Sequence, residues 1–129
     1  MIPAVLFDLD GTLIDSAADI HAAIARLLEG EGLEALDRAT VQSFVGNGLP
    51  KLVERVIGAV GLPMARHGEL TARALEIYNE APARLTRPYP GVMEALEALR
   101  ARGHALGLCT NKPEGPARKV LKALEMERF

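Results

Sequence analysis

Residues 3–12 read PAVLFDLDGT, an apolar run that ends abruptly at two aspartates and a glycine. The run predicts a strand over residues 3–9, and its continuous hydrophobicity favours cover on both faces, as in a parallel sheet. A tight loop follows, because Gly11 lets the backbone turn sharply. Asp8 and Asp10 are two positions apart at the end of this strand, so we expect their side chains to leave the same face and converge on one ligand.

A second apolar run, ALGLC at residues 105–109, predicts another buried strand, and we interpret Cys109 as a small buried residue of that strand. The run ends at Thr110-Asn111-Lys112-Pro113. Open α/β sheets bind ligands beyond the carboxyl ends of their strands. If the two strands are parallel neighbours, the two polar clusters therefore meet at one edge of the sheet.

The chain between these strands predicts an all-helical insert over residues 16–82. Apolar residues recur there at helical spacing in four stretches: after Ser16, which we interpret as an N-cap, after Asp37, from Pro50 to Gly61, and around residues 70–81 before Pro82. Further helices are expected at residues 92–99 and 117–124. The order strand, helices, strand, helix implies an α/β fold with two parallel strands joined by a right-handed crossover.

The segment RPYPG at residues 87–91 marks the return from the insert, because such a proline-rich stretch excludes helix. We therefore divide the chain into an α/β core, residues 1–15 and 87–129, and a helical cap, residues 16–86. The core holds only two predicted strands, whereas a mean sheet has about five or six. We expect exposed apolar surface and free strand edges, and we interpret the chain as the front part of a larger α/β domain.

The composition is that of a soluble globular protein: 49% of the 129 residues are hydrophobic and 25% are charged. A single cysteine excludes a disulfide scaffold and favours a cytoplasmic location. With 15 Lys and Arg against 17 Asp and Glu, the chain has no general attraction to nucleic acid or anionic lipid. No apolar run approaches the roughly 18 to 20 residues of a membrane span, so we expect neither nucleic acid nor membrane as a partner.

The residue types at the expected edge of the sheet point to phosphoryl transfer. Two neighbouring carboxylates repel each other, so one binds a cation or holds a proton. Mg²⁺ answers the first need and commonly grips a phosphate as well, and the second need yields a general acid. Thr110, Asn111 and Lys112 offer hydrogen-bond donors and a positive charge for phosphate oxygens. A carboxylate nucleophile beside an acid/base predicts an aspartyl-phosphate intermediate.

The motifs resemble those of a known family. FDLDGTLIDS at residues 7–16 is similar to the first motif of the haloacid dehalogenase-like (HAD) phosphohydrolases, and LCTNKP at residues 108–113 to their second. The insert resembles the small cap of the subfamily that contains phosphoglycolate phosphatases and β-phosphoglucomutases. Residues 15–20, 44–48 and 87–92 are most similar to the bacterial phosphoglycolate phosphatases. The resemblance implies a HAD-like Rossmannoid parallel sheet, incomplete here, with an inserted α-helical cap.

The resemblance also implies roles for individual residues. Asp8 becomes the nucleophile and a Mg²⁺ ligand, and Asp10 becomes the acid/base, with its main-chain carbonyl on the same metal. Thr110 holds the transferring phosphate, with Asn111 and Gly11 as further phosphate-binding residues. The implied substrate is a small phosphorylated acid, 2-phosphoglycolate. The family's third motif, a lysine, and its fourth, an acidic pair, lie on later strands, so we expect a truncated chain with half an active site.

Other interpretations stay open. One is a sugar-phosphate phosphatase or a β-phosphoglucomutase-like enzyme of the same subfamily. Another is a non-catalytic folding fragment or swapped subunit, which pairs with a second copy or with a missing C-terminal segment. Gly46-Asn47-Gly48 fits a backbone-amide site for a substrate carboxylate and a helix stop equally well. We interpret His21, His67 and His104 as surface or structural residues, Asp15 and Asp19 as helix-start charges, and Lys51 as a solvated side chain.

Overall fold

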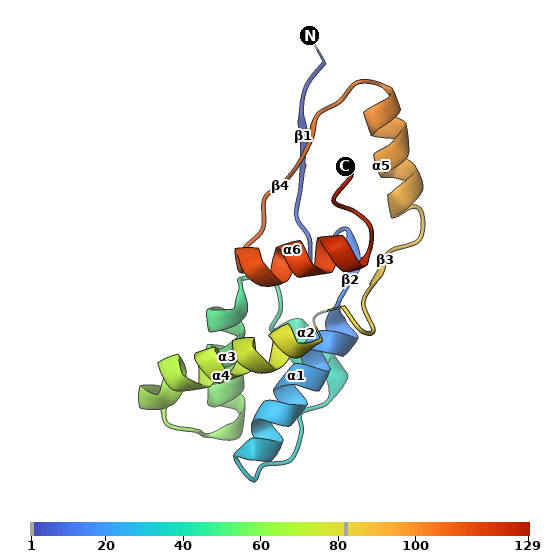
Figure 1. Ribbon diagram of the computed structural model, residues 1–129. Helices are drawn as coiled ribbons and strands as arrows, with labels where there is room; N and C mark the ends of the chain where they lie inside the picture. The colour runs from blue at the N-terminus through green and yellow to red at the C-terminus, as the bar shows by residue number, and fades with distance from the viewer. Residues whose placement is uncertain (1, 82) are drawn as a thin grey trace.

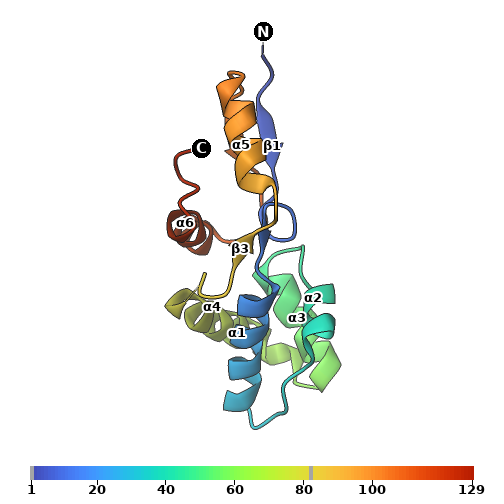
Figure 2. The same ribbon diagram turned by 90° about the vertical axis from the view of Figure 1, so that its right-hand side faces the viewer.

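The computed structural model describes residues 2–81 and 83–129, which form two lobes (Figures 1 and 2). A bundle of helices occupies one end of the molecule, and two strands with two helices occupy the other. The N-terminus lies at the end of the molecule farthest from the helical bundle. The chain crosses between the lobes twice, once on the way into the bundle and once on the way out.

The two predicted strands lie side by side. Strand β1 (Val5–Phe7) pairs in parallel with β4 (Leu106–Leu108), in a register that places Phe7 beside Leu108. The prediction that the strands are parallel neighbours is therefore confirmed. Both are shorter than the apolar runs that predicted them, although the carbonyl of Ala105 still accepts a hydrogen bond from the amide of Val5 (2.9 Å).

The expected cover on both faces of this sheet is wrong for this chain. Figure 2 shows helices α5 (Val92–Ala101) and α6 (Glu114–Ala123) on the same side of β1. They pack with a cluster of apolar side chains that comprises Leu9, Leu13, Ile14, Leu96, Ala117, Val120 and Met126. Leu6, in the middle of β1, is 68% exposed. The predicted exposure of apolar surface is confirmed.

Cys109 is also exposed, so its interpretation as a buried residue is wrong. The residue lies one position beyond β4, where its amide donates the last bond of the ladder to the carbonyl of Phe7 (2.8 Å). The apolar sequence around Cys109 predicted that other parts of the protein would bury this residue. The described residues supply no further strand beside β4 that could do so.

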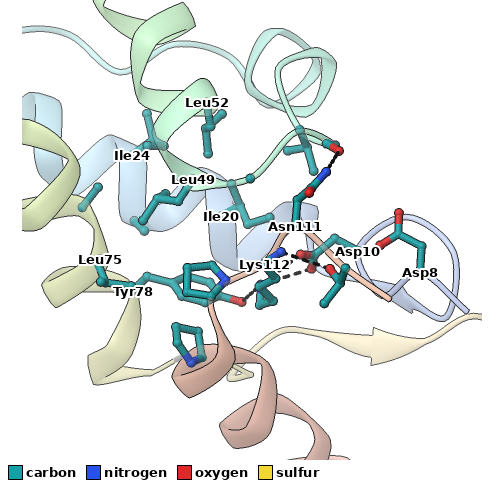
Figure 3. Close-up of a pocket in the computed structure, with 18 residues that line it drawn as sticks. Asp8, Asp10, Ile20, Ile24, Leu49, Leu52, Leu75, Tyr78, Asn111 and Lys112 are labelled. Carbon is teal, nitrogen blue, oxygen red and sulfur yellow. Dashed lines mark hydrogen bonds and ion pairs between the residues drawn. The ribbon is translucent and has the colours of Figure 1, made fainter. Parts of the chain in front are cut away.

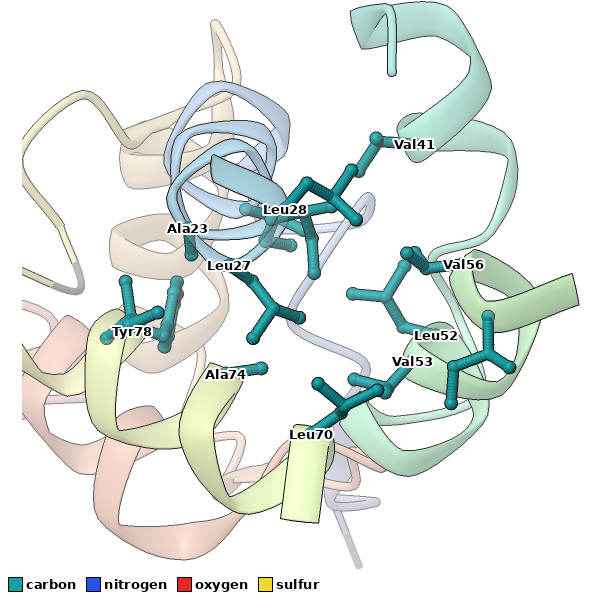
Figure 4. Close-up of a cluster of buried hydrophobic side chains, with 14 residues drawn as sticks. Ala23, Leu27, Leu28, Val41, Leu52, Val53, Val56, Leu70, Ala74 and Tyr78 are labelled. Carbon is teal, nitrogen blue, oxygen red and sulfur yellow. The ribbon is translucent and has the colours of Figure 1, made fainter. Parts of the chain in front are cut away.

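The cap is an all-helical bundle, as predicted. Its elements are α1 (Ala17–Gly30), α2 (Arg38–Ser43), α3 (Leu49–Val60), a 3₁₀ turn η1 (Met64–Arg66) and α4 (His67–Glu80). Their apolar faces meet in a core that includes Leu28, Val53 and Leu70 (Figure 4). Gly61, with φ of 77°, ends α3 in the left-handed conformation that glycine tolerates. Pro82, the predicted end of the last cap helix, lies outside the described residues.

The two chain crossings between the lobes are paired with each other. Strand β2 (Ile14–Asp15) pairs antiparallel with β3 (Arg87–Pro88). Asp19, which is 5% exposed, accepts hydrogen bonds from the amides of Leu85 (2.9 Å) and Thr86 (2.7 Å) and from the Thr86 hydroxyl. Asp19 does lie in the first turn of α1, but it also ties that helix to the returning chain. The division into residues 1–15 with 87–129 and residues 16–86 stays a proposal, whose boundaries fall at this crossing.

A surface ion pair in the cap gives a pH-dependent prediction. Arg66 donates two hydrogen bonds to Glu31 (2.6 and 2.8 Å), and these hold the pKa of Glu31 below its ordinary value of 4.5. A lowered carboxyl pKa stabilises the fold above the unfolded pKa, and this contribution disappears as the pH falls through the folded pKa. Glu31→Gln should therefore lower the urea midpoint at about pH 7, and this difference from the parent chain should shrink as the pH falls to about 3.

Glu29→Gln, a substitution on the last turn of α1, is the matched control for this measurement. The Glu29 variant should lack the loss of stability that Glu31→Gln shows at about pH 7. An equal effect of Glu31→Gln at both pH values would contradict the assigned role of the ion pair.

None of the helices formed by residues 2–81 and 83–129 combines the length and the apolar character that crossing a membrane requires.

Candidate active site

The polar residues that follow β1 and β4 line one pocket between the lobes (Figure 3). The core contributes Asp8, Asp10, Thr110, Asn111 and Lys112, and the cap contributes side chains from α1, α3 and α4. The parallel register explains the meeting, because it brings the carboxyl ends of both strands to the same edge. The pocket has a volume of about 60 Å³, which is room for roughly four to six water molecules.

Asp8 lies directly after β1 at the edge of this pocket. It is exposed, and its Oδ1 accepts a hydrogen bond from the amide of Leu9 (2.7 Å). Figure 3 shows its carboxylate separate from the cluster around Lys112. An exposed carboxylate at a strand end is open to attack an electrophile that enters the pocket.

Asp10 is held much more tightly than Asp8. Its side chain is 15% exposed and accepts hydrogen bonds from the Ser16 hydroxyl (2.6 Å) and from Lys112 Nζ (3.1 and 3.2 Å). Ser16 does precede α1, but its side chain makes no capping hydrogen bond. The interpretation of Ser16 as an N-cap is therefore corrected: its hydroxyl helps to orient Asp10.

Lys112 connects the two lobes. Its ammonium group, on a side chain that is 6% exposed, donates to Asp10 of the core and to the Tyr78 hydroxyl of the cap (2.7 Å). The same nitrogen lies 4.4 Å from the centre of the Tyr78 ring, which is a cation–π contact. Burial lowers the pKa of Lys112, and the charge of Asp10 opposes that shift. In this arrangement Lys112 neutralises Asp10, whereas its sequence position suggested a charge offered to phosphate.

Sequence reasoning missed Tyr78 as a site residue. Its spacing with Leu70, Ala74 and Ile77 indicated only the buried face of a helix. That indication is confirmed, because Tyr78 is 7% exposed, yet its hydroxyl reaches the core lobe. Burial, followed by the charge of Asp10, raises the pKa of the Tyr78 phenol, so the hydroxyl stays protonated. The one sequence signal for a role of Tyr78 in the site is its polar hydroxyl at the end of a mostly apolar side chain.

Thr110 and Asn111, which follow β4, also line the pocket. The Thr110 hydroxyl accepts a hydrogen bond from the amide of Lys112 (3.1 Å), which closes the loop after β4. Asn111 Nδ2 donates to the carbonyl of Gly46 in the cap (3.5 Å). Gly46 and Gly48 both line the pocket, and both have positive φ, 128° and 85°. The Gly46-Asn47-Gly48 segment therefore separates α2 from α3 and also faces the site.

Other candidate residues lie elsewhere. Gly11 lies outside the lining of this pocket and its amide donates to the carbonyl of Ile14 (3.0 Å). His21, His67 and His104 each contact a main-chain carbonyl at 2.7 Å, which is the structural use expected of them. Lys51 forms an exposed ion pair with Glu54 (3.0 Å), which fits the expected solvated side chain.

The oxygen atoms at this site meet the requirements of a bound metal ion only in part. Within the described residues, no group of three or more His, Cys, Asp or Glu side chains is arranged to hold a metal ion. Mg²⁺ characteristically keeps several waters and takes one or two carboxylates together with substrate phosphate. Asp8 offers an exposed carboxylate that meets this limited requirement, whereas the carboxylate of Asp10 is already bonded to Ser16 and Lys112.

Tyr78→Phe tests the contact between the lobes. The substitution removes the hydroxyl that Lys112 contacts and leaves a buried ammonium with one partner fewer. We expect a loss of about 1.5 kcal/mol in the free energy of unfolding, measured by urea denaturation. Tyr89→Phe is the matched control and should have little effect. Equal small losses in both variants would contradict a contribution from the Tyr78–Lys112 contact.

Comparisons with known proteins find a matching family and similar relatives. Residues 5–129 match the family model described as haloacid dehalogenase-like hydrolase. A protein named phosphoglycolate phosphatase from Cereibacter sphaeroides is 48% identical over 122 residues, covering 93% of this chain and 56% of the relative. One of the same name from Rhodospirillum rubrum is 44% identical over 130 residues, covering 96% and 54%.

A solved structure is similar as well. The crystal structure of a predicted phosphoglycolate phosphatase from Haemophilus somnus superposes with a TM-score of 0.89 at 30% identity, covering 97% of this chain and 58% of that one. The chain thus spans about half the length of the relatives it matches.

Proposed function

Because this chain belongs to the haloacid dehalogenase-like hydrolases, we propose that it is the nucleophile-bearing part of a phosphatase for a small phosphorylated acid, with 2-phosphoglycolate as the first candidate. The observation that carries the proposal is the meeting of Asp8, Asp10 and Thr110 around one pocket at the carboxyl ends of paired parallel strands. The names of the similar relatives support the choice of substrate.

In the proposed reaction, Asp8 attacks the phosphorus atom and forms an aspartyl-phosphate while the bond to the leaving alcohol breaks. Asp10, in its protonated form, donates this proton to the leaving oxygen, so that glycolate departs as a neutral alcohol at that atom. In the second step Asp10 takes a proton from the water that attacks the aspartyl-phosphate, which releases phosphate and restores Asp8. The hydrogen bonds from Ser16 and Lys112 fix the place of Asp10 during both steps.

The remaining residues bind and exclude water. Thr110, Asn111 and the loop around Gly11 surround the phosphoryl position in the proposal, with Gly11 contributing the shape of the turn. Mg²⁺ held by Asp8 and the Asp10 carbonyl would supply charge neutralisation on the phosphate oxygens. The cap contributes an apolar wall that includes Ile20, Ile24, Leu49, Leu52 and Leu75. Such a wall strengthens the electrostatic interactions inside the site, because it keeps bulk water out.

The names of the similar relatives favour 2-phosphoglycolate over a sugar phosphate. A cytoplasmic location is part of the same proposal. The proposal also includes a partner that covers the open sheet. This partner is either a second copy of this chain or a segment that corresponds to the part of the relatives that this chain does not match. Exposed Leu6 on β1 supports such a partner.

A phosphate-release assay on this chain tests the proposal. The substrates are 2-phosphoglycolate and a hexose phosphate, each with Mg²⁺ and with a chelator. We expect slow release from 2-phosphoglycolate that the chelator removes, because the loss of one charge-stabilising group costs about 10²- to 10³-fold and this chain spans half of its relatives. Faster release from the hexose phosphate would favour the sugar-phosphate alternative, and no release from either would favour a non-catalytic fragment.

A further inference from the structure

We propose that Arg55 is a positioning residue that fixes the segment of residues 44–48, here called the roof loop, over the pocket and against Asn111. The inference rests on the proposed function, because that function gives the pocket its role. The contacts of Arg55 described below do not depend on that function. Arg55 lies in α3 and is outside the pocket lining. Its influence on the site therefore passes through the roof loop.

The guanidinium of Arg55 holds the roof loop at two points. Nη1 donates to the carbonyl of Phe44 (2.8 Å), and Nη2 donates to the side-chain oxygen of Asn47 (2.8 Å). The planar fork of arginine presents two donors in a fixed relation, so both contacts form together at little further entropic cost. A lysine at this position would offer one compact charge and would not reproduce the pair of bonds.

The roof loop needs support from outside because its own sequence is permissive. Gly46 and Gly48 both adopt positive φ, and glycine loses more conformational freedom on folding than any other residue. The contacts of Arg55 reach Phe44, which precedes these glycines, and Asn47, which lies between them. They reduce the freedom of a segment that glycines would otherwise leave mobile.

The opposite side of the roof loop contacts the core lobe. Asn111 Nδ2 donates to the carbonyl of Gly46 (3.5 Å), and Figure 3 shows the Asn111 side chain reaching towards this loop. A Cβ atom on Gly48 would lie 2.9 Å from the main-chain oxygen of Asn111, which is closer than such atoms come. A shift of the roof loop therefore changes the pocket wall and the surroundings of Asn111 together, which links Arg55 to the loop after β4.

Nuclear magnetic resonance of the 129-residue chain tests the proposal without any substrate. In R55M we expect exchange of the hydrogen-bonded amides of Phe44 and Val45, which donate to the carbonyls of Val41 and Gln42, to rise about tenfold as the roof loop loosens. The side-chain amide resonances of Asn111, in the other lobe, should shift. Exchange in the buried parts of α1 and α4 should not change. R55K should give an intermediate result, which tests for partial rescue by charge alone.

Lys51→Met, an exposed substitution on the same helix, is the matched control and should leave both the roof loop and Asn111 unchanged. Asn47→Ala removes one partner of Arg55 from an exposed position, and so gives a test that does not depend on R55M folding. The effects of R55M and Asn47→Ala should be less than additive, because both break the same bond.

Gly48→Ala reaches the same result by a second route, since it should shift the Asn111 resonances while Arg55 keeps its partners. Two results would overturn the proposal: Asn111 resonances that stay in place in R55M, or faster exchange of all amides in equal proportion, which indicates a purely structural role. A lack of phosphate release would bear on the proposed function and leave these readouts valid.

Discussion

Asp8→Asn is expected to abolish phosphate release from 2-phosphoglycolate, with a reduction of about 10⁴-fold or more. The amide keeps the shape of the side chain, and its oxygen can still accept the Leu9 hydrogen bond, but it is a poor nucleophile towards phosphorus. The measurement is phosphate release with Mg²⁺, together with acid-trapping of a hydroxylamine-sensitive phosphoryl group on the chain. Both signals should be present in the parent chain and absent from the variant.

The control for this experiment is Asp15→Asn, which alters a nearby carboxylate outside the pocket lining. It should leave phosphate release and trapping close to those of the parent chain. Release or trapping that survives Asp8→Asn would remove Asp8 from the proposed mechanism, whatever the substrate proves to be.

Asp19→Ala is expected to destabilise the fold by about 3 kcal/mol. Thr86 is fully buried, so the substitution leaves its hydroxyl and amide, and the amide of Leu85, without the carboxylate that accepts from all three. Buried donors without partners cost about 1 to 3 kcal/mol each, although water that enters the space recovers part of this. Urea denaturation followed by circular dichroism measures the loss.

Asp37→Ala provides the comparison for Asp19→Ala, because Asp37 also accepts a backbone hydrogen bond, from Thr40 (2.7 Å), but at an exposed position. Its effect should be clearly smaller. If the two substitutions cost the same, burial of the Asp19 contacts does not contribute as inferred.

The sequence predicted the elements of the fold well, because each depends on local pattern. The periodic apolar residues of the cap placed its helices, and the order of elements implied the parallel pair that β1 and β4 form. The exposure of Leu6 and Cys109 was harder to predict. Hydrophobic strand residues indicate that cover is needed, but they do not reveal whether the same chain provides it.

In the candidate site, sequence reasoning predicted the cluster but not the bonds within it. Asp8, Asp10, Thr110 and Asn111 line one pocket because the strand ends coincide. The ion pair between Lys112 and Asp10 spans 102 positions, and the contact between Lys112 and Tyr78 spans 34. Asp19 and Thr86 are 67 positions apart. Such long-range pairs leave no local pattern, so only the folded geometry identifies them.

The pairing of Asp15 with Arg87 places the two ends of a 71-residue stretch, residues 16–86, at adjacent positions. A segment whose ends lie side by side can be replaced as a whole. A replacement of different length needs only to begin and end at the same two positions of the chain. Asp19 and Thr86 both belong to this stretch, so the hydrogen bonds between them would be kept if the stretch were transferred to another protein. In the proposed function, the cap wall of the pocket could therefore be replaced as a unit while Asp8, Asp10 and Thr110 stay in place.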